Sequence, residues 1–93
     1  MTTDRTVHDP AADLDYSQDW TAWLTDRGSD TISAATATVT DGAATVDRVT
    51  FDDTSVTFWV SAAGLGRLDV TVHITTTGDR EDDRIYPFLV AEH

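Results

Sequence analysis

The amino-acid sequence predicts an all-β protein, an immunoglobulin-like antiparallel β-sandwich of about seven strands with one short helical turn. Short runs rich in threonine and valine alternate apolar with polar residues, which is the two-residue period of a strand buried on one face only. Turn signals containing glycine and aspartate separate these runs by roughly 8–12 residues, a spacing typical of a sandwich. The chain has 93 residues, enough for one domain.

The beginning of the chain lacks these patterns. Residues 1–9 are polar and aperiodic, and we expect them to form a flexible arm ahead of a single sandwich domain at residues 10–93. The arm holds no apolar stretch of the kind found in signal peptides. No apolar run in the sequence approaches the ~20 residues that span a bilayer. We therefore expect a soluble protein that is made inside the cell.

A short helical turn is expected near the start of the domain. The segment Ala12–Tyr16 favours an extended conformation. Within Trp20–Leu24 the two tryptophans and the leucine follow the i, i+3, i+4 spacing of a helix. Asp19 or Ser17 is expected to cap this turn.

Five strands are expected after the helical turn, at Thr31–Thr40, Ala44–Phe51, Ser55–Ser61, Arg67–Thr77 and Arg84–Ala91. Alternation is clean in the third and fourth of them. It slips once in the second, where we expect a β-bulge. From these patterns the expected core consists of Leu14, Tyr16, Trp20, Trp23, Val56, Phe58, Val60, Leu68, Val70, Val72, Ile74, Tyr86, Phe88 and Val90.

The last expected strand is apolar on both of its faces. If its even-numbered residues point to the core, then Ile85, Pro87 and Leu89 point outward, where a sandwich strand facing water normally carries polar residues. Pro87 has no N–H donor, which is typical of an edge strand or a bulge. Two interpretations stay open: a loop or the N-terminal arm covers this face, or the face is an interface with another subunit or partner.

One tryptophan is also a candidate for an interface. Tryptophans in a small domain are most often core anchors, and they are also enriched where interfaces form. Trp59 points outward from a strand whose Phe58 and Val60 point inward. We therefore favour Trp59 over the other two tryptophans as an interface residue.

The composition is strongly acidic. The formal net charge is −11, and aspartate supplies 15 of the 17 acidic residues, whereas all six basic residues are arginine. A field of this sign repels phosphate backbones and anionic membrane surfaces, so neither nucleic acid nor membrane is an expected partner. The charge favours a halophilic source, where surface carboxylates keep a protein soluble in concentrated salt. A GC-rich genome is the alternative explanation for the missing lysines.

No pattern in the sequence indicates catalysis. The absence of cysteine excludes disulfides and thiol nucleophiles. No glycine-rich phosphate loop precedes a helix, and no serine has the setting of a nucleophile elbow. Paired acids occur at predicted turns, without an apolar enclosure to raise a pKa, and we interpret them as solvated: Asp13/Asp15, Asp52/Asp53 and Asp82/Asp83.

Metal binding is not indicated either. Three alternating acids, Asp79, Glu81 and Asp83, look like the start of a calcium loop, but the glycine and the bidentate glutamate of such a loop are missing. The three histidines, His8, His73 and His93, show none of the short spacings of zinc sites. We expect no metal, no cofactor and no enzymatic activity.

Two consecutive motifs, Pro10–Tyr16 and Asp19–Leu24, carry a family resemblance. They are similar to the signature of the phage fiber-tail adaptor proteins, in which a D-P-x-A-x-L-D-Y stretch leads into D-W-x-x-W-L. The pieces Val72–Thr76, Gly78–Arg80 and Asp82–Arg84 resemble later parts of that family. The resemblance implies an immunoglobulin-like sandwich with a structural role at the virion tail and no catalytic residues. The final strand departs from the family, whose members more often alternate there with polar residues.

Three functions are consistent with these observations. The first is a tail or connector adaptor that docks one virion protein onto another, as part of a homo-oligomeric ring, in a tailed virus of haloarchaea. Such a protein is made in the host cytoplasm and resides at the tail or head-tail region of the virion. The second is a capsid decoration or head-fiber module, and the third is a carbohydrate-binding sandwich that stacks sugars on Trp59 and Tyr86. The residues expected at the interface are Trp59, Ile85, Pro87 and Leu89, together with Thr2, Thr3, Arg5 and Val7 of the arm.

Overall fold

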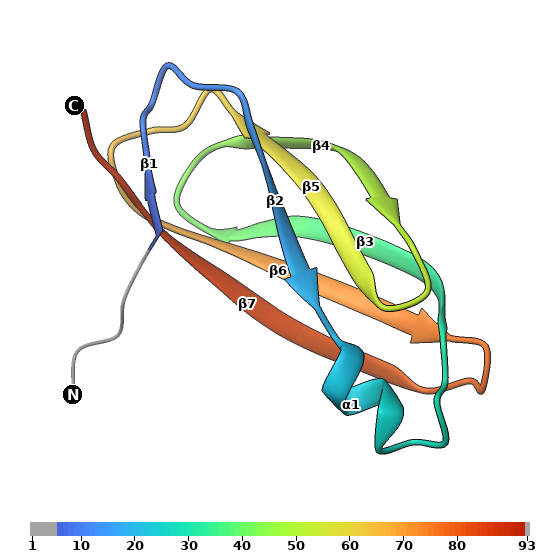
Figure 1. Ribbon diagram of the computed structural model, residues 1–93. Helices are drawn as coiled ribbons and strands as arrows, with labels where there is room; N and C mark the ends of the chain where they lie inside the picture. Colours follow the sequence, from blue (N-terminus) through green and yellow to red (C-terminus); the bar gives the residue numbers. More distant parts are fainter. Residues whose placement is uncertain (1–5, 93) are drawn as a thin grey trace, which may run out of the picture.

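Seven strands and one short helix make up the part of the chain that the computed structural model describes, residues 6–92 (Figure 1). In chain order the elements are β1 (Thr6–His8), β2 (Leu14–Asp19), α1 (Thr21–Thr25), β3 (Ile32–Asp41), β4 (Thr45–Phe51), β5 (Ser55–Ser61), β6 (Gly66–Thr76) and β7 (Glu81–Val90). The all-β prediction, with one helical turn after the first tryptophan, is confirmed.

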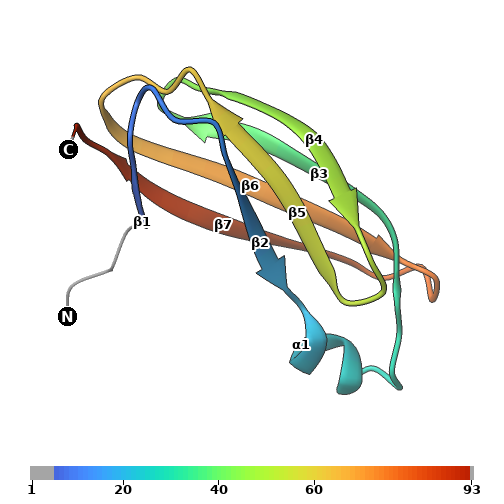
Figure 2. The same ribbon diagram turned by 45° about the horizontal axis from the view of Figure 1, so that its top comes forward.

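The strands form two sheets that lie face to face. One has four strands in the order β1-β7-β6-β3, and the other has three in the order β2-β5-β4. Figure 2 shows β2, β5 and β4 lying across the layer of β7, β6 and β3. Every pairing is antiparallel except that of β1 with β7, which is parallel. The bulge expected in the second strand after the helix lies in β4, between Asp47 and Thr50.

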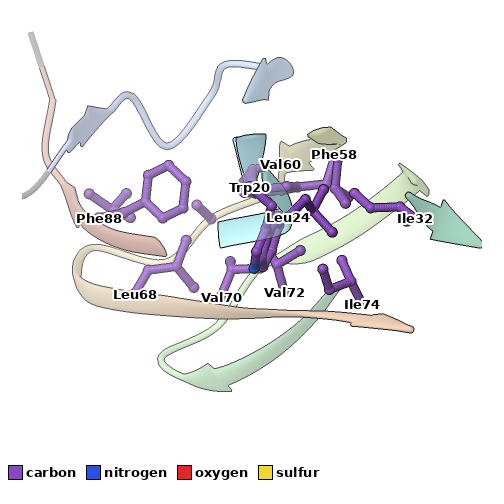
Figure 3. Packing of buried hydrophobic residues seen from close by; sticks show 13 residues of the cluster. Trp20, Leu24, Ile32, Phe58, Val60, Leu68, Val70, Val72, Ile74 and Phe88 are labelled. Atoms are coloured by element: carbon purple, nitrogen blue, oxygen red, sulfur yellow. The ribbon is translucent and has the colours of Figure 1, made fainter. Parts of the chain in front are cut away.

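The core fills the space between the sheets. Alternate residues of β5 and β6 face each other across it, and Trp20 and Leu24 enter it from the α1 segment (Figure 3). Burying each of these side chains contributes about 1.5–3 kcal/mol relative to leaving it in water. The fully or almost fully buried apolar residues are Trp20, Leu24, Ile32, Val56, Phe58, Val60, Ala63, Leu68, Val70, Val72, Ile74, Phe88 and Val90.

One residue expected in the core lies largely outside it. Leu14 is 46% exposed, because it begins β2, an edge strand, opposite Val60 and at the end of the sheet. Tyr16, Trp23 and Tyr86 are partly buried and pack against the core from its margin. Alternation assigns a side chain to a face of its strand, but it does not show where the opposing sheet ends.

The α1 segment is fixed to β7 by a polar contact to the buried Trp20. Its indole Nε1–H donates to the Asp82 carboxylate over 2.9 Å. Arg84 places its guanidinium 4.8 Å from the centre of the Trp20 ring and donates to the Asp19 carbonyl over 2.7 Å. Asp82, interpreted from the sequence as a solvated turn residue, therefore serves as a structural anchor, since the acceptor it supplies lets a polar indole edge be buried.

The N-cap of α1 is Trp20, with no side-chain cap hydrogen bond, so the prediction that Asp19 or Ser17 caps the turn is wrong; Asp19 lies one position before the N-cap. The Asp19 carboxylate accepts a hydrogen bond from the Thr21 amide over 2.8 Å. Hydrogen bonds from Thr21 lower the pKa of the Asp19 carboxyl below its ordinary value. Ser17, the other candidate, instead shares a hydrogen bond with the Thr57 hydroxyl across β2 and β5.

Asp30 joins the start of β3 to the hairpin between β6 and β7. Its carboxylate accepts from the Thr77 hydroxyl at 2.9 Å, the Gly78 amide at 3.1 Å and the Arg80 guanidinium at 2.9 Å. Hydrogen bonds from Thr76, and then from Thr77 and Arg80, hold the pKa of the Asp30 carboxyl far below its ordinary range. The charged hairpin loop is therefore tied to the body of the sandwich.

The N-terminal segment differs from the flexible arm that its polar sequence suggested. Thr6–His8 form β1 and add to the edge of the four-stranded sheet beside β7. His8 is fully buried, its ring lies against Tyr16 and Phe88, and its Nδ1 shares a 2.7 Å hydrogen bond with the Tyr16 hydroxyl. These contacts between aromatic rings help to hold a strand of only three residues in place.

Candidate docking surface

The outer face of the four-stranded sheet carries a contiguous row of apolar side chains. In β7 the even-numbered residues lie opposite the buried residues of β6, so Ile85, Pro87 and Leu89 point outward. Val7 of β1 lies beside Leu89 in the parallel pairing, on the same face. Ile85 is 60%, Leu89 42% and Val7 47% exposed, and Pro87 is partly exposed. We call these four residues the β7 stripe.

The arm does not cover this face within the described residues. One interpretation of the sequence was that the arm shields the outward residues of the last strand. Instead, β1 lies beside β7 in the plane of the sheet, and Val7 extends the apolar row by one residue. Four neighbouring apolar side chains facing water are unusual on a sheet of this size, where the outer face is normally polar.

Polar residues border the stripe on its β6 side. Thr71, Asp69 and Arg67 lie opposite Ile85, Pro87 and Leu89 in the ladder. Because neighbouring strands are about 4.8 Å apart, this polar column runs directly along the apolar one. The arrangement is that of an apolar strip with a polar rim, the general anatomy of a protein interface.

An acidic cluster with a histidine lies at the hairpin end of the stripe. His73 of β6 hydrogen-bonds through Nδ1 to Asp83 and through Nε2 to Glu81, the latter over 3.0 Å. Hydrogen bonds to Asp83, and secondarily to Glu81, raise the pKa of His73 above its ordinary value. With Asp82 these residues line a shallow, open hollow of about 340 Å³.

This cluster was not recognised from the sequence. His73 and Asp83 come together because they are directly opposite in the β6–β7 ladder. The sequence indicated this pairing only through the turn at Gly78, because a hairpin places the residues before its turn opposite the residues after it. Within the described chain, no group of three or more histidine, cysteine, aspartate or glutamate side chains is arranged to hold a metal ion.

Trp59 lies on the opposite side of the molecule from the stripe. It points away from the core of the three-stranded sheet, whereas the stripe points away from the four-stranded sheet. The Arg48 guanidinium stacks 4.1 Å from the centre of its ring. Asp13 holds that guanidinium with both carboxylate oxygens at 2.7 Å, and Asp47 holds it at 3.3 Å. The residues expected at one interface therefore divide between two faces.

Trp59 and Tyr86 also fail to form one platform. Tyr86 points inward and stacks on Phe88, with ring centroids 4.8 Å apart. Arg48 already occupies one face of the Trp59 ring. The structure thus separates the two aromatic residues that a sugar-stacking site on this domain required.

The remaining candidate residues belong to the N-terminal arm. Val7 joins the stripe as described, whereas Thr2, Thr3 and Arg5 lie outside the described residues. Over residues 6–92, the short α1 is far below the length and apolarity that a membrane-crossing helix requires.

Comparison with known proteins identifies the family. The sequence model of the family described as podophage GP4 fiber-tail adaptor protein gp77 matches residues 8–86. The match begins at the end of β1 and ends one residue before Pro87, so it includes Ile85 but not the C-terminal half of the stripe. No curated protein matches the sequence. Since the matched region covers nearly all of the sandwich, the chain belongs to the family of the podophage GP4 fiber-tail adaptor protein gp77.

Proposed function

We propose that the chain is a non-enzymatic structural protein of the virion, which docks a fiber or another tail component onto the tail through the β7 stripe. The family supports the adaptor role. The choice of the stripe as the docking surface is based on the row of outward apolar residues on β7, which Val7 on β1 continues. A rigid sheet presents this row without the entropic cost of ordering a loop.

In this proposal, the partner that binds to the stripe is a different virion protein and not a second copy of this chain. Carboxylates of Asp69, Asp83 and Glu81 border the stripe, so two copies that docked stripe to stripe would bring like charges together at this border. A partner with apolar residues at the centre and basic residues at the rim fits the surface better. Several adaptor copies in a ring around the tail then make a stable joint from individually weak contacts.

Replacing Leu89 by aspartate tests the surface. The folded domain should lose about 1 kcal/mol or less, because Leu89 is 42% exposed. An unpaired charge buried in the joint costs several kcal/mol, so incorporation of the variant into particles should fall at least tenfold. Incorporation is measured by complementing adaptor-deficient particles and quantifying the adaptor in purified virions.

The matched control is Leu65→Asp. Leu65 is 69% exposed in the loop before β6 and lies outside the stripe, so this variant should be incorporated normally. Normal incorporation of both variants would show that the stripe is not the docking surface. The same purified particles give the copy number, because an adaptor ring requires about six to twelve copies and a decoration protein requires hundreds.

The composition supports a further part of the proposal, namely that the virus infects haloarchaea. Screening of like charges by salt reduces the repulsion that destabilises a domain of charge −11. We expect the melting temperature at pH 7 to rise steeply between low and molar KCl. Near pH 4.2, the isoelectric point of the sequence, the same salt series should change it little. Equal responses at the two pH values, or no response at pH 7, would contradict the halophilic origin.

A further inference from the structure

Within residues 6–92, one side of β7 is only partly paired. On the side of β6 the ladder runs along the whole of β7, from Glu81 to Val90. On the other side β1 reaches only Phe88–Val90. Figures 1 and 2 both show β1 beside the C-terminal end of β7, and no other described strand pairs with that side. We call this side of residues 81–87, along which no strand of residues 6–92 pairs, the open edge.

Two hydrogen bonds at the ends of β7 establish which backbone groups face the open edge. At the hairpin, the Thr76 amide donates to the Arg80 carbonyl over 2.8 Å, so the even-numbered residues exchange hydrogen bonds with β6. At the other end, the Ala91 amide donates to the His8 carbonyl over 3.1 Å, so the odd-numbered residues face the β1 side. The amides of Asp83 and Ile85 therefore point to the open edge, and no described residue supplies a backbone acceptor for them.

Pro87 interrupts the row of backbone donors along this side of β7. It occupies an odd position, so its nitrogen faces the β1 side, but it has no hydrogen to donate. A strand continuing past Pro87 loses one ladder hydrogen bond there. The next two odd positions, Ile85 and Asp83, again offer complete donor and acceptor pairs. The open edge is thus a separate pairing segment beyond the proline.

The side chains along the open edge select against a second copy of this chain. Glu81 and Asp83 point outward next to it, and among the described residues the ion-pair partner of both is His73 of β6. Asp82 and Arg84 point to the inner side, where Trp20 and the Asp19 carbonyl engage them. Pairing two such edges brings like charges into opposition, which destabilises a ladder. A strand with basic residues meets no such penalty.

We propose that the open edge of β7 accepts an extended segment of the partner virion protein as an added strand, with an apolar residue beside Ile85 and basic residues beside Asp83 and Glu81. This inference rests on the proposed docking function and specifies its partner. The backbone amides of Asp83 and Ile85 supply the affinity, as in other cases of strand addition. Ile85, the most exposed member of the stripe, is covered when the strand is added.

The test compares Ile85→Pro with Ile85→Ala. Both variants trim the side chain, but only proline removes the amide that faces the open edge, and the ladder with β6 does not use that amide. Pro87 shows that this side of β7 tolerates proline. We expect Ile85→Ala to be incorporated into particles within about threefold of the wild type, and Ile85→Pro at least tenfold less.

Two further measurements make the result decisive. Leu89→Asp separates the two proposals: if it blocks incorporation while Ile85→Pro is incorporated as well as Ile85→Ala, docking stands and strand addition is overturned. If melting shows that Ile85→Pro is unfolded, hydrogen exchange on the wild type decides. The amides of Asp83 and Ile85 should exchange at least tenfold more slowly in assembled particles than in the free protein, and equal rates would overturn strand addition.

Discussion

Replacing Trp20 by alanine should remove about 3–5 kcal/mol from the free energy of unfolding. The indole is fully buried at the centre of the core, next to Leu24 and the inward residues of β6. Truncation leaves a cavity that the two rigid sheets cannot close. It also leaves the Asp82 carboxylate without its indole donor. A domain of this size has in total about 5–14 kcal/mol of stability, so a large part of it depends on one side chain.

Urea unfolding followed by circular dichroism measures this loss of stability. Two further variants separate the contribution of the Asp82 hydrogen bond from that of the buried apolar volume. Trp20→Phe keeps most of the apolar volume and removes the donor to Asp82, so it should cost about 2 kcal/mol. Trp23→Ala should cost less than Trp20→Ala, because Trp23 is only partly buried and stacks against Arg27 at the surface. A loss below 1 kcal/mol for Trp20→Ala would show that the core does not depend on this residue.

Replacing Gly42 by alanine should also destabilise the fold strongly. Gly42 lies in the turn between β3 and β4 with φ at +87°, a conformation that costs other residues about 1–2 kcal/mol. A Cβ atom here would lie 2.3 Å from the Arg67 carbonyl oxygen and 3.1 Å from the Leu68 Cα. Both are backbone atoms, so the start of β6 must move away. The clash adds to the conformational cost.

Gly28→Ala is the matched control for this prediction. Gly28 also has a positive φ, of +75°, but an added Cβ would meet nothing within 4 Å. Thermal melting of the two variants should therefore show a larger loss for Gly42→Ala, and the difference measures the contact with Arg67. Equal losses would mean that the turn relaxes without disturbing β6.

Much of the fold follows from local sequence. The strands β5 and β6 and the inward positions on them follow from strict alternation of apolar and polar residues. The bulge in β4 corresponds to the point where alternation slips, and the helical turn follows from the spacing of the two tryptophans and Leu24. The outward direction of Ile85, Pro87 and Leu89 was readable in the same way, so most of the stripe was predictable.

Other features depend on contacts between distant residues. Trp20 and Asp82 are 62 positions apart, and nothing local marks Asp82 as a buried acceptor. His73 meets Asp83 only through the register of β6 with β7. Residues 6–8 carry no strong strand signal, and β1 exists because β7 offers it an edge and the aromatic rings of the core enclose His8. In each case the conformation or contact depends on a residue or strand that is distant in the sequence, and not on the neighbouring residues.

Which residues of each strand point toward the core and which point away can be read from the sequence, because that choice depends on the two-residue period of the extended chain. The sheet that each strand joins is visible only in the folded molecule. The folded molecule likewise shows that Val7 lies beside Leu89, that Trp59 lies on the far side of the sandwich, and that part of β7 has an open edge. The physical reason is that pairing joins residues from opposite ends of the chain, and its free energy depends on packing that no local pattern encodes.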